Sequence, residues 1–520
     1  MHKITGKIVS GLQKHQKPRE REFIGTLQDN FESSFYRFRK QRGVNLGSWF
    51  VLERWITDAP FRSAAPPAQS DLDVARGQNA RSVLEVHYAN WITESDWAWI
   101  SDRGLNTVRI PIGYYHLCGA DSSVLTGTDF ENFSDVFSGA WVRLIQAIET
   151  AQRFGLGVLL DLHAAPGKQN KDAHAGTSNP ATFFSNRRNR MHTIHVLRTL
   201  VTHLNAHSPR LVNVVGIELL NEPQPPVDAE LKNWYSTAIK DISALDPTLP
   251  IYLGDCWKTD QYAEYIKSTP HPSPLLVLDH HLYRCFTSSD ISTPASSHAQ
   301  ALTDKSAATP RMFARVAEIL DSAGAGFIVG EWSGALNPGS LTGSPDDTKN
   351  YVTAQLQLYE AHCSGNFFWT YKKIGHRDRG WCLRDAVDGG VFPHKVGLFA
   401  SRSSEGDHER QTQTRDNLKN IALNEHTAYW SKYPGKYRHE RFAEGFTLGW
   451  DDAYIFFTAN SRLDRPISEL GFIGAWAKIR TDDQSNFLGI PSRIQARCEC
   501  SQKGFPGKLL LIDVATVQMG

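Results

Sequence analysis

The sequence lacks an excess of charge of either sign. Its 56 Lys and Arg residues stand against 55 Asp and Glu residues, a formal net charge of +1 over 520 residues. A protein that binds nucleic acid or an anionic membrane through its surface charge usually carries a clear basic excess. We therefore expect no nucleic-acid partner and find no electrostatic argument for a membrane surface.

Long apolar runs are also missing. A membrane-spanning helix needs about 18–20 consecutive apolar residues, and the most apolar stretches are interrupted early, as Glu218 interrupts residues 211–220. The basic segment 1–22 has no continuous apolar core before a cleavage site, so it does not resemble a secretory leader. We expect no membrane span and a cytoplasmic protein as the sequence stands, or a secreted one if the N-terminus is truncated.

Cysteine is scarce and scattered, which disfavours a disulfide framework and a zinc site. The seven cysteines lie at positions 118, 256, 285, 363, 382, 498 and 500, and the pair 498 and 500 has no second pair to complete a zinc site. The histidines at 163, 174, 280 and 281 could gather around a metal, but no H-E-x-x-H spacing supports this. We expect free thiols, no metal and no cofactor.

Two further catalytic motifs are weak or missing. No G-x-S-x-G nucleophile elbow occurs. Gly324, Gly326 and Gly330 faintly resemble a dinucleotide-binding loop, but they precede a strand-like run and open no helix. These glycines are better explained as the end of a helix and the start of a strand.

The sequence does contain a repeated alternation of short apolar runs and helical stretches. Helix signals occur at 93–104, 141–155, 228–244 and 347–362. Eight units between positions 42 and 372 indicate a (β/α)8 TIM barrel of the α/β class, with a doubly wound open sheet as the alternative. The strand-like runs are 42–49, 107–112, 157–163, 213–223, 250–255, 275–283, 326–332 and 365–372.

This alternation predicts three parts of the chain. Residues 1–41 form an N-terminal extension whose first part is predicted to be disordered, and residues 42–425 form the barrel. Residues 426–520 are rich in aromatic side chains, and apolar patches that large are rarely left exposed on soluble monomers. We therefore expect a C-terminal appendage that packs on the outside of the barrel, away from its mouth.

Two glutamates stand at the ends of strand-like runs. Glu222 lies in Asn221-Glu222-Pro223, and Glu331 follows Gly330 after another apolar run. In a TIM barrel the C-terminal ends of all strands open onto one mouth. Two carboxyls there suit glycoside cleavage, because one can protonate the leaving oxygen while the other attacks the anomeric carbon or activates water. Taken alone, each glutamate could instead be an ion-pair partner at a strand end.

At this point the sequence resembles glycoside hydrolase family five, and within it the fungal exo-β-1,3-glucanase (glucan 1,3-β-glucosidase) branch. The resemblance covers residues 42–372 and implies a retaining, exo-acting β-glucosidase that removes terminal glucose from β-1,3-glucan or related β-glucosides without a metal or cofactor. The similar segments are RGVNLGSWFVLE (42–53), LEVHYANWITESDW (84–97), LNTVRIPIGYY (105–115), DLHAAPGKQN (161–170), GIELLNEP (216–223), DHHLY (279–283), GEWSGA (330–335) and FFWTYK (367–372).

The resemblance assigns catalytic roles. It implies that Glu222 is the general acid/base and Glu331 the nucleophile of a two-glutamate double displacement. Asn221 would bind the sugar 2-hydroxyl, while Arg109 and Tyr283 would hold and polarise Glu331. The chemistry agrees, because an Arg and a Tyr beside a carboxylate favour its ionised form. Without the resemblance, a buried Arg is more often a structural ion-pair partner.

The resemblance also assigns substrate-binding roles. His163 and His281 would order the carboxylates and the sugar, Glu53 would bind outer hydroxyls of the terminal glucose, and Trp369 would form its stacking floor. Each of these residues has a plain alternative, since most tryptophans belong to the core and most buried histidines are simply hydrogen-bonded.

The chain departs from the family pattern at the leaving-group side of the site. Family members that trim β-1,3-glucan typically carry a Phe shortly after Gln169-Asn170, where this chain has Lys171-Asp172 and no aromatic residue. The opposite aromatic clamp residue is retained as Phe286. Two alternatives therefore stay open: an intracellular β-glycosidase acting on a small or lipid-linked glucoside, and a sugar-binding protein without catalysis. We expect a monomer.

Overall fold

Eight strands form a closed, all-parallel barrel in which β1 also pairs with β8. The computed structural model describes residues 32–269, 275–344, 346–398, 407–458 and 468–488. The prediction of a TIM barrel is confirmed, and the open sheet is wrong because both sheet edges are paired. The strands are β1 (Gln41–Asn45), β2 (Thr107–Gly113), β3 (Gly157–Ala164), β4 (Val214–Glu218), β5 (Ile251–Gly254), β6 (Leu276–Arg284), β7 (Gly326–Leu336) and β8 (Gly365–Phe368).

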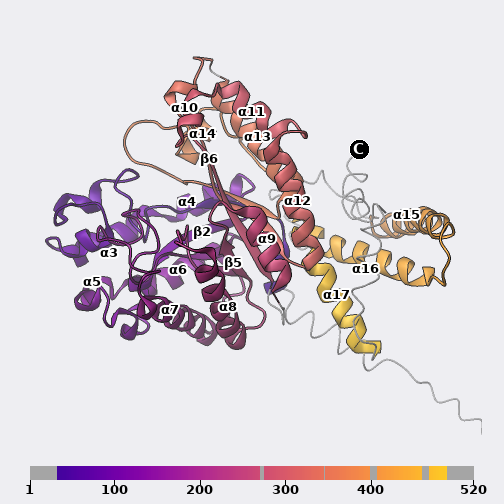
Figure 1. Ribbon diagram of the computed structural model, residues 1–520, viewed down its shortest axis with the longest axis horizontal. Helices are drawn as coiled ribbons and strands as arrows, with labels where there is room; N and C mark the ends of the chain where they lie inside the picture. The colour runs from indigo at the N-terminus through magenta and orange to yellow at the C-terminus, as the bar shows by residue number, and fades with distance from the viewer. Residues whose placement is uncertain (1–31, 270–274, 345, 399–406, 459–467, 489–520) are drawn as a thin grey trace, which may run out of the picture.

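Helices surround this barrel (Figure 1). Parallel strands need long connections, and the covering helices explain why the strands are apolar on both faces. Every residue of β2 and β3, for example, is buried. The helices are α2 (Asp71–Ala75), α3 (Ala80–Trp91), α4 (Glu94–Asp102), α5 (Ser134–Phe137), α6 (Ala140–Arg153), α7 (Arg187–Ala206), α8 (Asp228–Leu245), α9 (Thr259–Ser268), α10 (Ser288–Ser292), α11 (Ala295–Thr303), α12 (Ala308–Ala323), α13 (Asp347–His362), α14 (Leu383–Asp388), α15 (Asp407–Trp430), α16 (His439–Thr458) and α17 (Ile473–Leu488).

Four of these helices are those that the sequence signals predict: α4, α6, α8 and α13. Helix α4 begins with the capping box read from the sequence, in which the Thr93 N–H donates to the Asp96 carboxylate at 2.9 Å. The cap satisfies N–H groups that have no partner inside the first helical turn.

Residues 469–476, from the C-terminal part of the chain, cover the N-terminal end of the barrel. This end is opposite the strand ends that carry the two glutamates. Phe472 and Trp476 join a buried apolar cluster with Phe38 and with residues from six of the strands, β3 to β8. A hydrogen bond of 2.7 Å from Lys40 N to the carbonyl of Glu469 ties this segment to the residues before β1. We call this cluster the barrel floor.

Helices α15 and α16 extend to one side of the barrel, and α17 lies beside α12 (Figure 1). Helix α15 runs across the predicted boundary at residues 425 and 426. The boundaries of the three predicted parts stay predictions, and most of the N-terminal extension lies outside the described residues. Within the described ranges, no helix combines the length and apolarity needed to cross a bilayer.

Candidate active site

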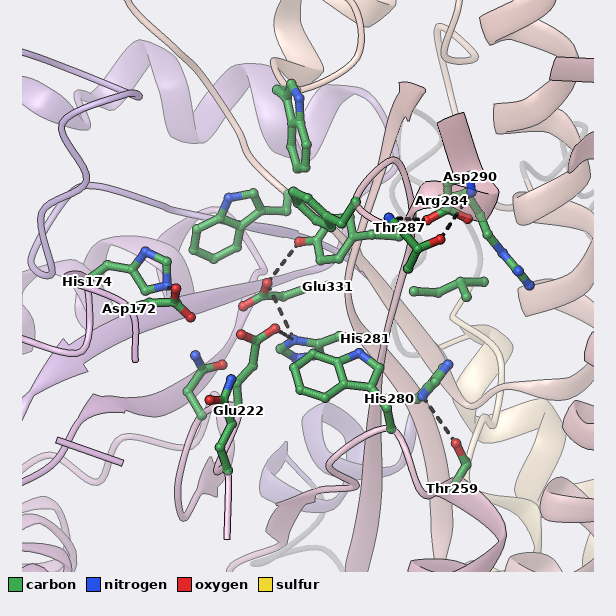
Figure 2. Close-up of a pocket in the computed structure, with 18 of the residues that line it drawn as sticks. Asp172, His174, Glu222, Thr259, His280, His281, Arg284, Thr287, Asp290 and Glu331 are labelled. Atoms are coloured by element: carbon green, nitrogen blue, oxygen red, sulfur yellow. Dashed lines mark hydrogen bonds and ion pairs between the residues drawn. The ribbon is translucent and has the colours of Figure 1, made fainter. Parts of the chain in front are cut away.

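A cavity of about 1480 Å³ opens at the C-terminal ends of the strands (Figure 2). Nine of the ten predicted site residues line it, and the tenth, Arg109, lies fully buried beneath it. The structure therefore brings together residues that are more than 300 positions apart in the sequence. The nine lining residues are Glu53, His163, Asn221, Glu222, His281, Tyr283, Phe286, Glu331 and Trp369.

Glu331 on β7 is held by two donors. Arg109 Nη1 on β2 donates to Oε1 at 3.0 Å, and the Tyr283 hydroxyl on β6 donates to Oε2 at 2.9 Å. Burial, followed by the nearby Glu331 charge, raises the pKa of Tyr283 well above its usual value, so the phenol keeps its proton. Both carboxylate oxygens are thereby fixed in direction.

Glu222 follows β4 in a strained turn. Its φ of 41° lies in the left-handed region, which costs a non-glycine residue on the order of 1–3 kcal/mol and is concentrated at functional sites. Asn170 Nδ2 donates to the Glu222 carbonyl at 3.2 Å and helps to hold this turn. The turn directs the carboxyl group of Glu222 towards His281 (Figure 2).

The two carboxylates approach each other closely across His281. One oxygen of Glu222, one ring nitrogen of His281 and one oxygen of Glu331 all lie within 4.8 Å of one another. His281 Nδ1 is 2.7 Å from Glu222 Oε1 and 3.5 Å from Glu331 Oε2. The imidazole therefore lies within reach of both carboxylates.

Electrostatics places a proton on His281 in the free protein. Burial opposes the charged imidazole, but the carboxylates of Glu331, Asp279 and Glu222 raise the pKa of His281 well above its usual value. Burial also opposes ionisation of Glu222, but the hydrogen bond and the charge of His281 lower the pKa of Glu222 to about 2. Burial raises the pKa of Glu331, an effect that His281 and Arg109 oppose. The protonation of His281, Glu222 and Glu331 is therefore coupled, because the charge of each group shifts the pKa of the others.

The predicted sugar-binding residues lie next to this cluster. Asn221 accepts from Arg109 Nη2 at 2.8 Å, which leaves its amide group beside His163 at 3.4 Å. His163 Nδ1 lies 2.7 Å from Asp161, and its ring stacks parallel to that of Trp369 with the centroids 5.7 Å apart. The indole of Trp369 is therefore fixed in orientation at the wall of the cavity.

Glu53 lines the cavity from the loop after β1. Trp55 Nε1 donates to its carboxylate at 2.7 Å, and His174 Nδ1 lies 3.5 Å from the same oxygen. His174 Nε2 also lies 3.8 Å from the Asp172 carboxylate. Asp172 is in the segment where this chain lacks the aromatic residue that the family pattern has. Trp55 was not identified from the sequence, where its position two residues after Glu53 was the available signal.

Aromatic side chains also face the cavity beyond Tyr283. Phe286 is 70% exposed and contacts Trp381 at a ring distance of 6.0 Å. Trp257, after β5, is half exposed and lines the same cavity. Neither Trp257 nor Trp381 was identified from the sequence, because each lies in a loop outside the recognised motifs.

A buried layer of acids beneath the cavity was not identified as part of the site. Asp161, Glu218 and Asp279 are each at most 1% exposed, and Arg109 forms ion pairs with the first two at 3.1 and 2.8 Å. Asp279 could have been found from strand periodicity, because it lies two residues before His281 on β6, whereas Glu218 ends β4 and Glu222 lies in the turn beyond it. Even-numbered spacings place residues on the same face of a strand.

Two groups of side chains are close enough together to hold a metal ion in the described part of the chain. They are Glu218, Asp279 and His281, and Glu222, His281 and Glu331. Both groups share His281, whose two nitrogens already face carboxylates. In the second group, the contacts of His281 with Glu222 at 2.7 Å and with Glu331 at 3.5 Å account for the arrangement.

Comparison with known proteins gives a consistent result. The family description "Cellulase (glycosyl hydrolase family 5)" matches residues 75–374, and "Glucan 1,3-beta-glucosidase 3 C-terminal domain" matches residues 411–495. Glucan 1,3-beta-glucosidase 3 of Schizosaccharomyces pombe is 28% identical over 467 residues, covering 86% of this chain and 92% of that protein.

Two further relatives agree with these matches. Probable glucan 1,3-beta-glucosidase A of Aspergillus fumigatus is 30% identical over 394 residues, covering 68% of this chain and 87% of that protein. The crystal structure of rutinosidase from Aspergillus niger has a TM-score of 0.54 at 20% identity, covering 68% of this chain and 98% of that one. That structural likeness supports the fold alone.

Proposed function

Because the chain belongs to glycosyl hydrolase family 5 and is therefore a glycoside hydrolase, we propose that it is a retaining, exo-acting β-glucosidase. It removes terminal glucose from β-1,3-glucan or a related β-glucoside. The substrate class is supported by the two fungal relatives, which are named as glucan 1,3-β-glucosidases. The chemistry is supported by the paired carboxyls of Glu222 and Glu331.

The spacing of the two carboxyls is the observation that carries the proposal of retention. Their nearest oxygens lie within 4.8 Å, whereas inverting enzymes keep the carboxyl groups roughly 6.5–9.5 Å apart to admit a water molecule. A spacing below that range favours direct attack by Glu331 on the anomeric carbon over activation of an intervening water.

In the first step, Glu331 forms a bond to the anomeric carbon while the glycosidic bond breaks. The bonding electrons pass to the leaving oxygen, and Glu222 supplies its proton. Arg109 and Tyr283 orient the attacking carboxylate. In the second step, water attacks the anomeric carbon, Glu222 accepts the water proton, and the bond to Glu331 breaks.

The test is the stereochemistry of the first product and its dependence on the two glutamates. Hydrolysis of an aryl β-glucoside, followed by proton NMR, should release the β-anomer first. Glu331→Gln should abolish turnover. Glu222→Ala should keep partial activity on activated aryl glucosides, with azide restoring the rate as a β-glucosyl azide. An α-anomer as the first product would contradict the proposal.

A small or lipid-linked glucoside is a second candidate substrate. The exposed faces of Phe286 and Trp257 in the cavity favour it, because apolar side chains at a leaving-group site suit an apolar aglycone. Comparing kcat/KM for laminari-oligosaccharides with that for sterol and lipid glucosides separates the two candidates. A cytoplasmic location and a monomeric state are further proposals, which cell fractionation and light scattering test.

A further inference from the structure

A third carboxylate lies behind the shared histidine of the active site. Asp279, His281 and Tyr283 are alternate residues of β6, so their side chains lie on the same face of the strand. Asp279 is 1% exposed. Its Oδ2 lies 3.8 Å from His281 Nε2, while Nδ1 of the same ring lies 2.7 Å from Glu222. The ring thus bridges a buried carboxylate and a reacting one.

The backbone fixes Asp279 in place. Its Oδ1 accepts a hydrogen bond of 2.6 Å from the N–H of Gly330, the residue before Glu331. A side chain at position 330 would collide with the Asp279 carboxylate, because an added Cβ would lie 2.0 Å from Oδ2. Glycine at position 330 therefore lets Asp279 reach across to β7, close beneath the imidazole.

Two carboxylates on opposite sides of an imidazole favour its doubly protonated form. A neutral ring carries a proton on only one nitrogen, so its other nitrogen would present a lone pair to a carboxylate oxygen. The other titratable groups around this ring are Glu331 on β7 and Glu218 on β4, and the charges of Arg109 on β2 and His163 on β3 act on Glu331.

We propose that Asp279 is a positioning residue that makes His281 the store of the catalytic proton, resting on the glycosidase activity proposed above. In the free enzyme the proton is on His281 Nδ1. As a substrate binds, this N–H bond breaks and the proton passes to the Glu222 carboxylate. Glu222 then gives it to the leaving oxygen, which keeps the electron pair of the glycosidic bond.

The proton returns in the second half of the reaction. After Glu331 has formed its bond to the sugar, it no longer carries a negative charge, so His281 is stable as the neutral ring with its proton on Nε2 facing Asp279. Glu222 accepts a proton from the attacking water and passes it to His281 Nδ1. The charge of His281 therefore follows the charge of Glu331 through the cycle.

The test variant is Asp279→Asn, which keeps an acceptor oxygen for Gly330 and removes the charge facing His281. For glucosides with a poor leaving group, kcat/KM should fall by roughly 10–100-fold, part of the roughly 10²–10⁴-fold that acid–base catalysis contributes. Dinitrophenyl glucoside, which needs little protonation, should lose much less. The alkaline limb of the pH profile should move to lower pH, because His281 holds its proton less tightly.

A matched control is the pair formed by Asp255, directly after β5, and His280, which lies on the opposite face of β6 from His281. Asp255 is buried and lies 2.7 Å from His280 Nδ1, so Asp255→Asn disturbs a similar pair away from the cavity centre. It should change both substrates equally and leave the pH limb unmoved. Equal losses on both substrates in Asp279→Asn, with an unmoved limb, would overturn the proposal.

A second measurement does not depend on glycosidase activity. Nitrogen-15 NMR of the imidazoles, with the His281 signal assigned by its loss in His281→Asn, reports the protonation of this ring directly. We expect His281 to be doubly protonated at neutral pH in the native protein and to titrate at lower pH in Asp279→Asn. A neutral His281 at pH 7, or identical titration in both proteins, would contradict the inference even if the enzyme acts on another glycoside.

Discussion

Replacing Phe472 by alanine should weaken the protein without altering its chemistry. The Phe472 ring is fully buried in the barrel floor, where it lies against the backbone of Gly326. A Cβ added to Gly326 would lie 2.5 Å from the ring, so the ring and the backbone of Gly326 are closely packed. The substitution would leave a cavity beneath the strands that the surrounding barrel is too rigid to fill.

The magnitude follows from this burial. Phe→Ala substitutions in cores cost about 3–5 kcal/mol, from lost transfer free energy and the residual cavity together. With an unfolding entropy of about 2 cal/mol/K per residue, a chain of this size loses roughly 1 °C of Tm per kcal/mol, which gives a fall of about 3–5 °C. Urea unfolding followed by tryptophan fluorescence should show a lower midpoint with an unchanged slope.

The control is Ile421→Ala on α15, a side chain that is 56% exposed. It should change the free energy of unfolding by less than about 0.5 kcal/mol. For both variants, kcat and KM measured at 25 °C should stay within about twofold of the native values, because the floor and the mouth are at opposite ends of the strands. Unchanged stability of Phe472→Ala, or a changed aglycone preference at full stability, would refute this reasoning.

Three further predictions follow from the ion pairs, the loop after β3 and the cysteines. Burial opposes ionisation of Glu360, but Lys40 and Arg42 lower its pKa to about 2, so its contribution to stability is present above the unfolded value of about 4.3 and is lost as pH falls towards 2. Glu360→Gln should therefore flatten the loss of Tm between about pH 5 and pH 2, and an unchanged profile would contradict the ion-pair assignment. Asp172→Phe should raise kcat/KM for laminaribiose by about tenfold, equal to about 1.4 kcal/mol, and should raise that for an aryl glucoside less. Equal changes for both substrates would mean that position 172 does not face the second sugar. Thiol titration of the denatured, unreduced protein should detect all seven cysteines, of which the five in the described residues are free. Five or fewer reactive thiols would contradict this prediction.

The sequence predicted the barrel well because strand runs and helix signals are local. The eight apolar runs overlap the eight strands, and the helix predicted at 347–362 has those same bounds. The motif residues could likewise be expected near one mouth, since each lies in a strand or in the segment after it and all strand ends share that mouth. The contacts between Glu331, Arg109 and Tyr283 agree with the predicted arrangement, although their catalytic roles stay predictions.

The remainder of the site depends on side-chain packing between distant segments. Glu218 appeared in the sequence only as an interruption of an apolar run, and nothing local showed that Arg109 would pair with it. The position of Trp257 depends on a turn in which Cys256 and Trp257 both adopt positive φ values, of 52° and 57°. Neither of these two positions is a glycine, so the turn could not be predicted from the residue types there.

The barrel floor also constrains the order in which the protein can form during synthesis. Its apolar cluster joins Phe38, made before the first strand, to Phe472 and Trp476, made after the last. Contacts between such distant segments form late, because the intervening chain must first be ordered. A ribosome-bound chain that has completed β8 still lacks the side chains that cover the underside of its strands. We expect that intermediate to expose an apolar surface and to be prone to aggregation until residues 472–476 have been added.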